Sequence, residues 1–320
     1  MAAARPTSCS RPAFYWRTLA GGMPLTFALA LGLSAAMMAA PNEAAAQGFV
    51  CGGSVTGAAP VTGAGATAAT ATDTACGTSA TAAGGTGNAT AIGTASNANG
   101  SNSTAIGGGS NANTTSATAI GASALALANG STALGFNAII NPNATNGTAL
   151  GDSAKVDVGS SGSTAVGFQA AIGQNVANGT ALGTSANVVA TSGTAVGANA
   201  SIGQNASSGT ALGTSAGVGA ASGTAVGASA LVAAGATNGT VIGFNAVVGV
   251  NAANGTVIGS NAGVGSNSGT ALGSGALIAV NANNGTALGS NAAIAAGATN
   301  GTALGANATR QFRRLDRDRC

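Results

Sequence analysis

Asn300-Gly301-Thr302-Ala303-Leu304-Gly305 is a phrase that the chain repeats along most of its length. Its central pattern is Thr, then Ala or Val, then an aliphatic residue, then Gly. It occurs fifteen times, with a short step between copies, as from Thr90 to Thr104, or a step longer by two, as from Thr132 to Thr148. The copies begin at Thr90, Thr104, Thr118, Thr132, Thr148, Thr164, Thr180, Thr194, Thr210, Thr224, Thr240, Thr256, Thr270, Thr286 and Thr302. A weaker copy begins at Thr74, one long step before Thr90. This strict period predicts a repeat architecture in which each copy is one structural unit.

The length of the unit selects its structure. Helical-hairpin repeats need more than about 30 residues, whereas 14 to 16 residues suit two short strands and two turns. Because side chains alternate along a strand, Thr180 and Leu182 are expected on one face of the first strand. Ala181 and Gly183 are expected on the opposite face. A second apolar cluster at Val188–Val189 predicts the second strand.

The residues before each repeat threonine predict a tight turn. Gly directly precedes the threonine in ten of the fifteen copies, and in six of these Asn precedes the Gly. Asn and Gly both tolerate positive φ, which a tight reversal needs. The two step lengths differ by two residues, so a longer coil keeps every later side chain on its own face. The addition is expected either at a turn or as one residue in each strand.

These patterns together predict an all-β fold, a parallel β-roll or solenoid of 14–16-residue coils. At about 4.8 Å per coil, sixteen coils would form a rod roughly 75 Å long with ladders of identical side chains. The Ala/Gly face would allow close approach of another layer, whereas the aliphatic ladder would need a cover. A coil this short encloses little volume, and side-by-side association of several rods would supply that cover.

Composition excludes several classes of function. Only 5% of the residues are charged, 3% are aromatic, and His is absent. A disordered low-complexity chain is an alternative for such a composition, but the fixed phase of the aliphatic residues argues against it. Between Asn88 and Thr309 the only charges are Asp152, Lys155 and Asp157, so no basic stripe for nucleic acid exists there.

No pattern in the sequence predicts an enzyme. Without His there is no His-based triad or His-ligated metal, and we expect no catalytic residue, no cofactor and no metal. Asp152 and Asp157 could in principle form a calcium ligand pair, but charged residues of a solvated turn are the simpler interpretation.

The remaining residues predict four segments. Arg5, Arg11 and Arg17 precede an apolar stretch at 25–40, so residues 1–46 are expected to be a signal peptide, with a membrane anchor as the alternative. Residues 47–87 are expected to form an N-terminal cap segment, 88–309 the repeat array, and 310–320 an unstructured tail, for which truncation is one interpretation. In an oxidising compartment Cys51 and Cys76 are candidates for a disulfide, and two unpaired thiols are the alternative.

The phrase also carries a family resemblance. Asn-Gly-Thr-Ala-Leu-Gly-x-x-Ala and its variant Asn102-Ser103-Thr104-Ala105-Ile106-Gly107-Gly108-Gly109-Ser110 resemble the YadA-like head repeat of trimeric autotransporter adhesins. The resemblance implies a left-handed parallel β-roll, a homotrimer, and attachment of a Gram-negative bacterium to host cells, extracellular matrix or surfaces. It also implies export to the cell surface and outer membrane, and a role in virulence.

One departure from that family affects the expected location. The coiled-coil stalk and the barrel anchor that the family places after the head are not recognisable in residues 310–320. A chain of this extent is therefore expected to be secreted or periplasmic, and a non-functional truncated adhesin is an alternative. A second functional class is a secreted ice-binding or other flat-surface-binding solenoid, suggested by one threonine per coil and little charge.

Overall fold

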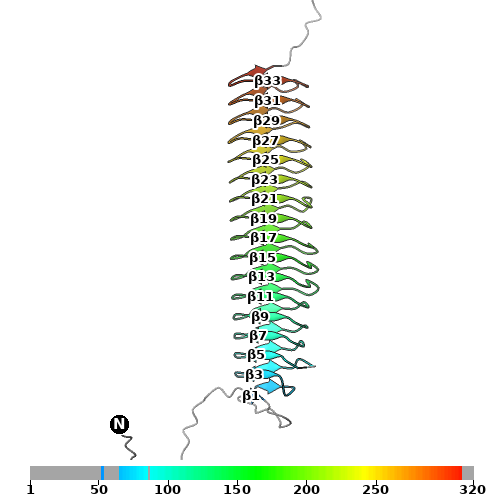
Figure 1. Ribbon diagram of the computed structural model, residues 1–320, viewed down its shortest axis with the longest axis vertical. Coiled ribbons are helices and arrows are strands. Elements are labelled where there is room, and N and C mark those ends of the chain that lie inside the picture. The colour runs from blue at the N-terminus through cyan, green and yellow to red at the C-terminus, as the bar shows by residue number, and fades with distance from the viewer. Residues whose placement is uncertain (1–51, 54–64, 86, 312–320) are drawn as a thin grey trace, which may run out of the picture. The chain divides into compact units, whose positions relative to one another are not determined.

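The chain winds as a parallel β-solenoid of about fifteen turns, which confirms the predicted all-β fold class. The computed structural model describes residues 52–53, 65–85 and 87–311, and these form strands and turns without a helix. Each coil supplies one three-residue strand to a first sheet and one two-residue strand to a second sheet. The coils stack in chain order, as Figure 1 shows.

The two sheets divide the strands by odd and even number. The first sheet contains β3 (Thr74–Cys76), β5 (Thr90–Ile92), β7 (Thr104–Ile106), β9 (Thr118–Ile120), β11 (Thr132–Leu134), β13 (Thr148–Leu150), β15 (Thr164–Val166), β17 (Thr180–Leu182), β19 (Thr194–Val196), β21 (Thr210–Leu212), β23 (Thr224–Val226), β25 (Thr240–Ile242), β27 (Thr256–Ile258), β29 (Thr270–Leu272), β31 (Thr286–Leu288) and β33 (Thr302–Leu304). The second sheet contains β2 (Thr67–Ala68), β4 (Thr81–Ala82), β6 (Asn97–Ala98), β8 (Asn111–Ala112), β10 (Leu125–Ala126), β12 (Ile139–Ile140), β14 (Lys155–Val156), β16 (Ala171–Ile172), β18 (Asn187–Val188), β20 (Ser201–Ile202), β22 (Gly217–Val218), β24 (Leu231–Val232), β26 (Val247–Val248), β28 (Gly263–Val264), β30 (Leu277–Ile278), β32 (Ala293–Ile294) and β34 (Thr309–Arg310).

The register places equivalent residues of successive coils directly over one another. Thr180 of β17 pairs with Thr194 of β19, and Leu182 pairs with Val196. The weaker copy follows the same rule, since Cys76 pairs with Ile92. One strand departs from the parallel pattern: β1 (Gly52–Gly53) runs antiparallel to β3 and covers the N-terminal edge of the first sheet.

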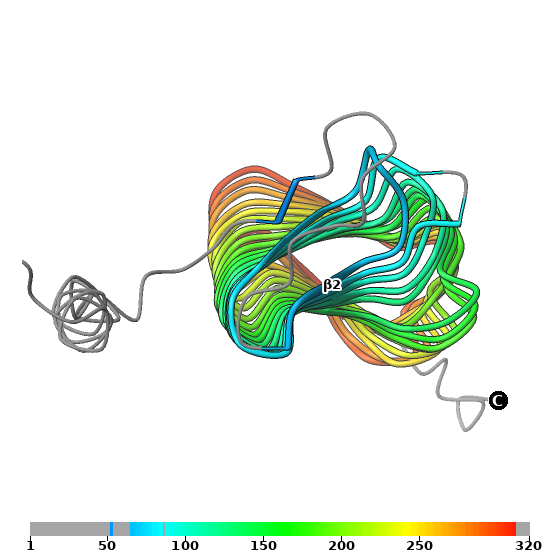
Figure 2. The same cartoon turned by 90° about the horizontal axis from the view of Figure 1, so that it is seen from below.

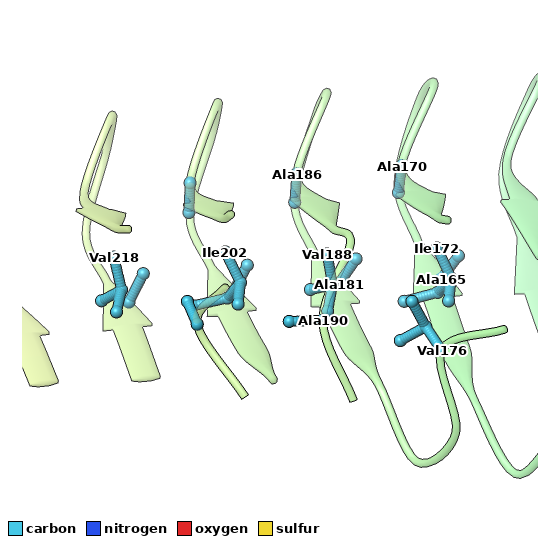
Figure 3. Close-up of a cluster of buried hydrophobic side chains, with 14 of the residues drawn as sticks. Ala165, Ala170, Ile172, Val176, Ala181, Ala186, Val188, Ala190, Ile202 and Val218 are labelled. Carbon is cyan, nitrogen blue, oxygen red and sulfur yellow. The ribbon is translucent and has the colours of Figure 1, made fainter. Parts of the chain in front are cut away.

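Alternation along each strand separates a core face from an outer face. Ala181, the middle residue of β17, is fully buried, whereas Leu182 beside it is 44% exposed. In the second sheet the inward position is the second residue of each strand, as at Val188 and Ile202. Figure 3 shows these side chains filling the space between the two strands of a coil. The alanine face is therefore the one that packs against another layer, as predicted.

The turns use positive φ differently from the expectation. Asn146 has φ 56°, but the following Gly147 lies outside the left-handed region. A Cβ at Gly147 would lie 2.8 Å from the carbonyl oxygen of Ala144 and 3.3 Å from Cγ2 of Ile140. The asparagine therefore makes the reversal, and the glycine is needed because the turn interior has no room for a side chain.

Each coil has a first turn, between its two strands, and a second turn, which leads to the next coil. The longer coils place their two additional residues in this second turn. In the coil that begins at Thr132, Asn143 with φ 63° and Asn146 form two successive left-handed reversals, and Ala144 between them is fully buried. The strands keep the same length in short and long coils. Figure 2, which looks along the stack, shows the two sheets as layers joined by these turns.

A column of glycines ends the strands of the first sheet. Gly183 has φ 138°, and a Cβ there would lie 2.5 Å from the carbonyl oxygen of Gly197 in the next coil. Both the backbone conformation and the close approach of coils require glycine. Gly305, in the last described coil of the array, has no atom within 4 Å of its Cβ position.

Candidate binding surfaces of the solenoid

The outer face of the first sheet carries two parallel ladders, which we call the Thr–Leu face. Each of the fifteen repeat threonines begins a strand of this sheet, and the aliphatic residue two positions later ends the strand. Leu182 and Leu212 are 44% and 45% exposed. Large side chains of the ladder that are at least 38% exposed are Ile92, Leu134, Leu150, Leu182, Leu212, Ile242, Ile258, Leu272, Leu288 and Leu304. Isolated exposed leucines are common on proteins, but exposed aliphatic residues at ten of fifteen stacked positions are not.

The outer face of the second sheet is less regular. Its outward residues are mixed, with polar residues such as Asn97, Lys155 and Ser201 among apolar ones such as Leu125, Ile139 and Val247. A shallow apolar groove lies over Gly263 and Gly265, flanked by Val247, Leu277 and Val280. Sequence reasoning missed this groove, because it arises where a glycine interrupts a column of larger side chains.

The first turn of each coil presents another surface. Phe136, Phe168 and Phe244 follow the strand-ending glycines of their coils and are 61%, 48% and 60% exposed. Asp152 takes the same turn position in the coil between Phe136 and Phe168. The sequence signal for this grouping is the equal spacing of Phe136, Asp152 and Phe168, one long step apart, which sequence reasoning did not use.

Two of the three charged residues of the array pair with each other, and the third, Asp152, has a neutral partner. The Nζ atom of Lys155 lies 2.9 Å from Oδ2 of Asp157. Oδ1 of Asp157 accepts hydrogen bonds from Nδ2 of Asn141 and the backbone N–H of Val158. Burial raises the pKa of Asp157, but these hydrogen bonds and the Lys155 charge outweigh it and lower the pKa overall. Oδ1 of Asp152 instead accepts from the Ser153 hydroxyl at 2.7 Å.

No cluster suited to a metal ion occurs in residues 52–53, 65–85 and 87–311. These residues contain no group of three or more His, Cys, Asp or Glu side chains that could hold one. The calcium alternative for Asp152 and Asp157 therefore has no third carboxylate from the described part of the chain.

The N-terminal end of the stack is held by side-chain contacts as well as by β1. Asp73, which is 1% exposed, accepts hydrogen bonds from the backbone N–H groups of Thr70 and Ala89, both at 2.9 Å, and so links two coils. Cys76 is disulfide-bonded. Its predicted partner Cys51 lies outside the described residues, as do the predicted signal peptide and residues 312–320.

Asparagines at the turn tips form cross-coil pairs. Nδ2 of Asn238 donates to Oδ1 of Asn254 at 3.1 Å, and Asn284 donates to Asn300 in the same way. The sequence predicted asparagine in these turns for its backbone conformation alone. The structure adds a second role, which is to connect neighbouring coils.

Comparison with known proteins leaves the chain without an assigned family. No protein-family model matches it, and no curated protein matches it. No helix among the described residues has the length and hydropathy to cross a bilayer.

Proposed function

We propose that this chain is the head of a bacterial surface adhesin, in which left-handed solenoids associate side by side as a homotrimer. The observation that carries the proposal is the Thr–Leu face, an exposed apolar ladder along the first sheet. The resemblance of the repeat to YadA-like heads supplies the handedness, the number of chains and the Gram-negative source. The predicted signal peptide adds export to the cell surface or the medium.

The size of the Thr–Leu face suits an interface. The width of the face is the length of a three-residue strand, about 10 Å, and its length over sixteen coils is about 75 Å. The face therefore covers on the order of 700 Å². Specific interfaces bury about 800 Å² on each partner. Between Thr90 and Leu304 the strands of this sheet contain no ionisable residue, so burial of the face would leave no unpaired charge there.

Repetition would supply the binding strength of such a head. Each coil presents a similar set of turn atoms to a ligand, and three chains multiply the number of contacts. Many weak contacts at regular spacing give high avidity without a deep pocket. Host cells, extracellular matrix and abiotic surfaces are the expected targets.

The proposal is tested first by sedimentation of the exported chain. We expect a trimer, and we expect Leu182→Asp combined with Leu212→Asp to dissociate it because charges would enter an apolar interface. Ser201→Asp is the matched control, since Ser201 is half-buried on the outer face of the second sheet. A monomeric parent chain, or equal dissociation by the double variant and by Ser201→Asp, would contradict the proposal.

Binding is tested with the same proteins on plates coated with extracellular matrix, on cultured cells and on bare polystyrene. The parent chain and the Ser201→Asp variant are expected to bind, and the dissociated variant is expected to bind much more weakly. If none of these surfaces retains the parent trimer, the adhesin assignment fails even though the trimer stands.

A further inference from the structure

Two exposed phenylalanines and a carboxylate form one column on the first turns. The backbone N–H of Ser153 donates to the carbonyl of Phe136 at 2.9 Å, and that of Gln169 donates to the carbonyl of Asp152 at 2.9 Å. These bonds place Phe136, Asp152 and Phe168 at equivalent positions of three consecutive coils. Both phenylalanines are about half exposed or more, and Asp152 is exposed.

The charge of Asp152 is not neutralised by a cation within the described part of the chain. The one ion pair found there joins Lys155 to Asp157. Asp152 accepts a hydrogen bond from the neutral hydroxyl of Ser153. The column therefore presents a negative charge between two aromatic side chains.

The spacing of the column matches a particular kind of ligand. Two coils separate the backbones of Phe136 and Phe168 by about 9.6 Å, so a group centred over Asp152 lies about 4.8 Å along the stack from each. Cation–π attraction acts within about 6 Å of a ring centroid. A methylated ammonium fits this setting, because it carries charge for the carboxylate and methyl groups for the rings and needs no hydrogen-bond acceptor.

We propose that Phe136, Asp152 and Phe168 form a binding site for a trimethylammonium group, as carried by choline and its phosphate esters. The neighbouring coils carry small side chains at this turn position, which leave room for the ligand. The same turn position is Ala122 in the preceding coil and Thr184 in the following coil, so small side chains flank the two rings.

The chain contains its own control. Phe244 occupies the same turn position and is 60% exposed, but Ala228 and Ser260 flank it in the neighbouring coils. It has neither a carboxylate beside it nor a second ring two coils away. The site therefore predicts a ligand contact at Phe136 and Phe168 that Phe244 lacks.

The test is saturation-transfer NMR of the full exported chain with choline chloride. We expect transfer to the choline methyl groups and none to 3,3-dimethyl-1-butanol, which has the same shape without charge. Asp152→Asn is expected to weaken choline binding about fivefold, from the loss of a unit charge near 4 Å. Phe136→Ala and Phe168→Ala should each weaken it about two- to fivefold, and Phe244→Ala should leave it unchanged.

Sedimentation of each variant separates this site from chain association, since these turn substitutions are expected to leave the assembly as it is. Retention of the chain on phosphatidylcholine vesicles but not on phosphatidylglycerol vesicles would assign the group to a lipid. Binding of choline and phosphocholine without vesicle retention would assign it to a free ligand. Equal binding of choline and its neutral analogue, or an unaltered affinity in Asp152→Asn, would overturn the proposal.

Discussion

The coils before and after residue 130 share a backbone but have different cores. In the N-terminal coils the inward residue of the second sheet is alanine, at Ala68, Ala82, Ala98, Ala112 and Ala126. From Ile140 to Ile294 the same position is always Val or Ile. Strand lengths and register are the same in both regions. Turns and alternation therefore determine the fold, whereas the size of the core side chains determines how much apolar burial stabilises it.

The alanine-cored region also contains buried polar atoms that lack a hydrogen-bond partner. Oδ1 of Asn97, Oγ of Ser103, Oδ1 of Asn111 and Oγ1 of Thr114 are buried without a hydrogen-bond partner among the described residues, and all four lie in this region. Each such atom costs roughly 1–3 kcal/mol. Local opening is therefore expected first in the N-terminal coils. The antiparallel strand β1 and the disulfide at Cys76 lie at this end, where they offset the weaker core.

The largest predicted effect comes from changes in the glycine column, which both regions share. Gly107→Ala and Gly213→Ala, one in each region, would each place a Cβ 2.5 Å from a carbonyl oxygen of the next coil, at φ 127° and 138°. Strained φ alone costs roughly 1–3 kcal/mol, so we expect a loss above about 3 kcal/mol at either site. Thermal unfolding followed by circular dichroism checks this.

Gly305→Ala is the control for the glycine column. Its φ of 114° is also left-handed, but no atom lies within 4 Å of the new Cβ. It should cost about 1 kcal/mol, from backbone strain alone. If all three variants unfold together, the close approach of coils does not explain the column.

The next largest effect is expected from substitutions that give a coil of one region the core residue of the other region. Ile140→Ala gives the first large-core coil the core of its neighbour at Ala126, and truncation of a buried Ile costs about 2–5 kcal/mol. The reverse change, Ala126→Val, should cost about 1–3 kcal/mol if the alanine core is close-packed. Hydrogen exchange of the amides in β10 and β12 measures both. A gain in protection from Ala126→Val would instead show unfilled space in the alanine-cored region.

Reduction of the disulfide should affect one region only. Disulfides stabilise by about 2–4 kcal/mol, and the loss is expected at β3 and β5 because coils interact only with their neighbours. Hydrogen exchange at β31 should not change. Mass spectrometry of unreduced peptides identifies the partner of Cys76; a peptide joined to any cysteine other than Cys51 would show the predicted pairing to be wrong.

The smallest predicted effect is the pH dependence of stability that comes from Asp157, a residue near the boundary between the two regions. The pKa of Asp157 is lower in the folded chain than its ordinary value of 3.8, so its ionised form stabilises the fold. That contribution is complete above 3.8 and is lost as the pH falls through the folded pKa. It should be below about 1 kcal/mol because the pair is partly exposed. Thermal unfolding of the parent chain and of Asp157→Asn on both sides of this window measures it, and an equal pH response of the two would exclude Asp157 as the cause.

Much of the fold could be predicted because many copies of the repeat give the same weak secondary-structure signal at a fixed spacing. A single Thr180–Leu182 segment has no decisive strand signal, but fifteen copies at even spacing predict strands, faces and register together. Two features could not be predicted from one copy. The role of Gly147 depends on atoms of Ala144 and Ile140 that approach only in the folded turn. The cross-coil hydrogen bond from the Ala89 N–H to Asp73 depends on the stacking of two coils, which brings together groups 16 residues apart in sequence.

The candidate surfaces were predictable to different degrees. The outward position of Thr180 and Leu182 follows from alternation, and the notion that this ladder needs a cover comes from its apolar content. The Phe136–Asp152–Phe168 column was hidden in the sequence, because its members are separated by a full repeat and become neighbours only through the stacking of coils. In a solenoid, residues one period apart are therefore the ones to compare when a site is sought.

Because every step of the repeat is even, the protein can gain or lose whole coils during evolution. Duplication or deletion of one coil's codons would extend or shorten the stack by about 4.8 Å while every remaining side chain kept its face. The new junction would resemble the existing ones, since each glycine of the column before Gly305 already approaches a glycine of the next coil. A lineage could thus change the reach of the molecule without redesigning a single contact.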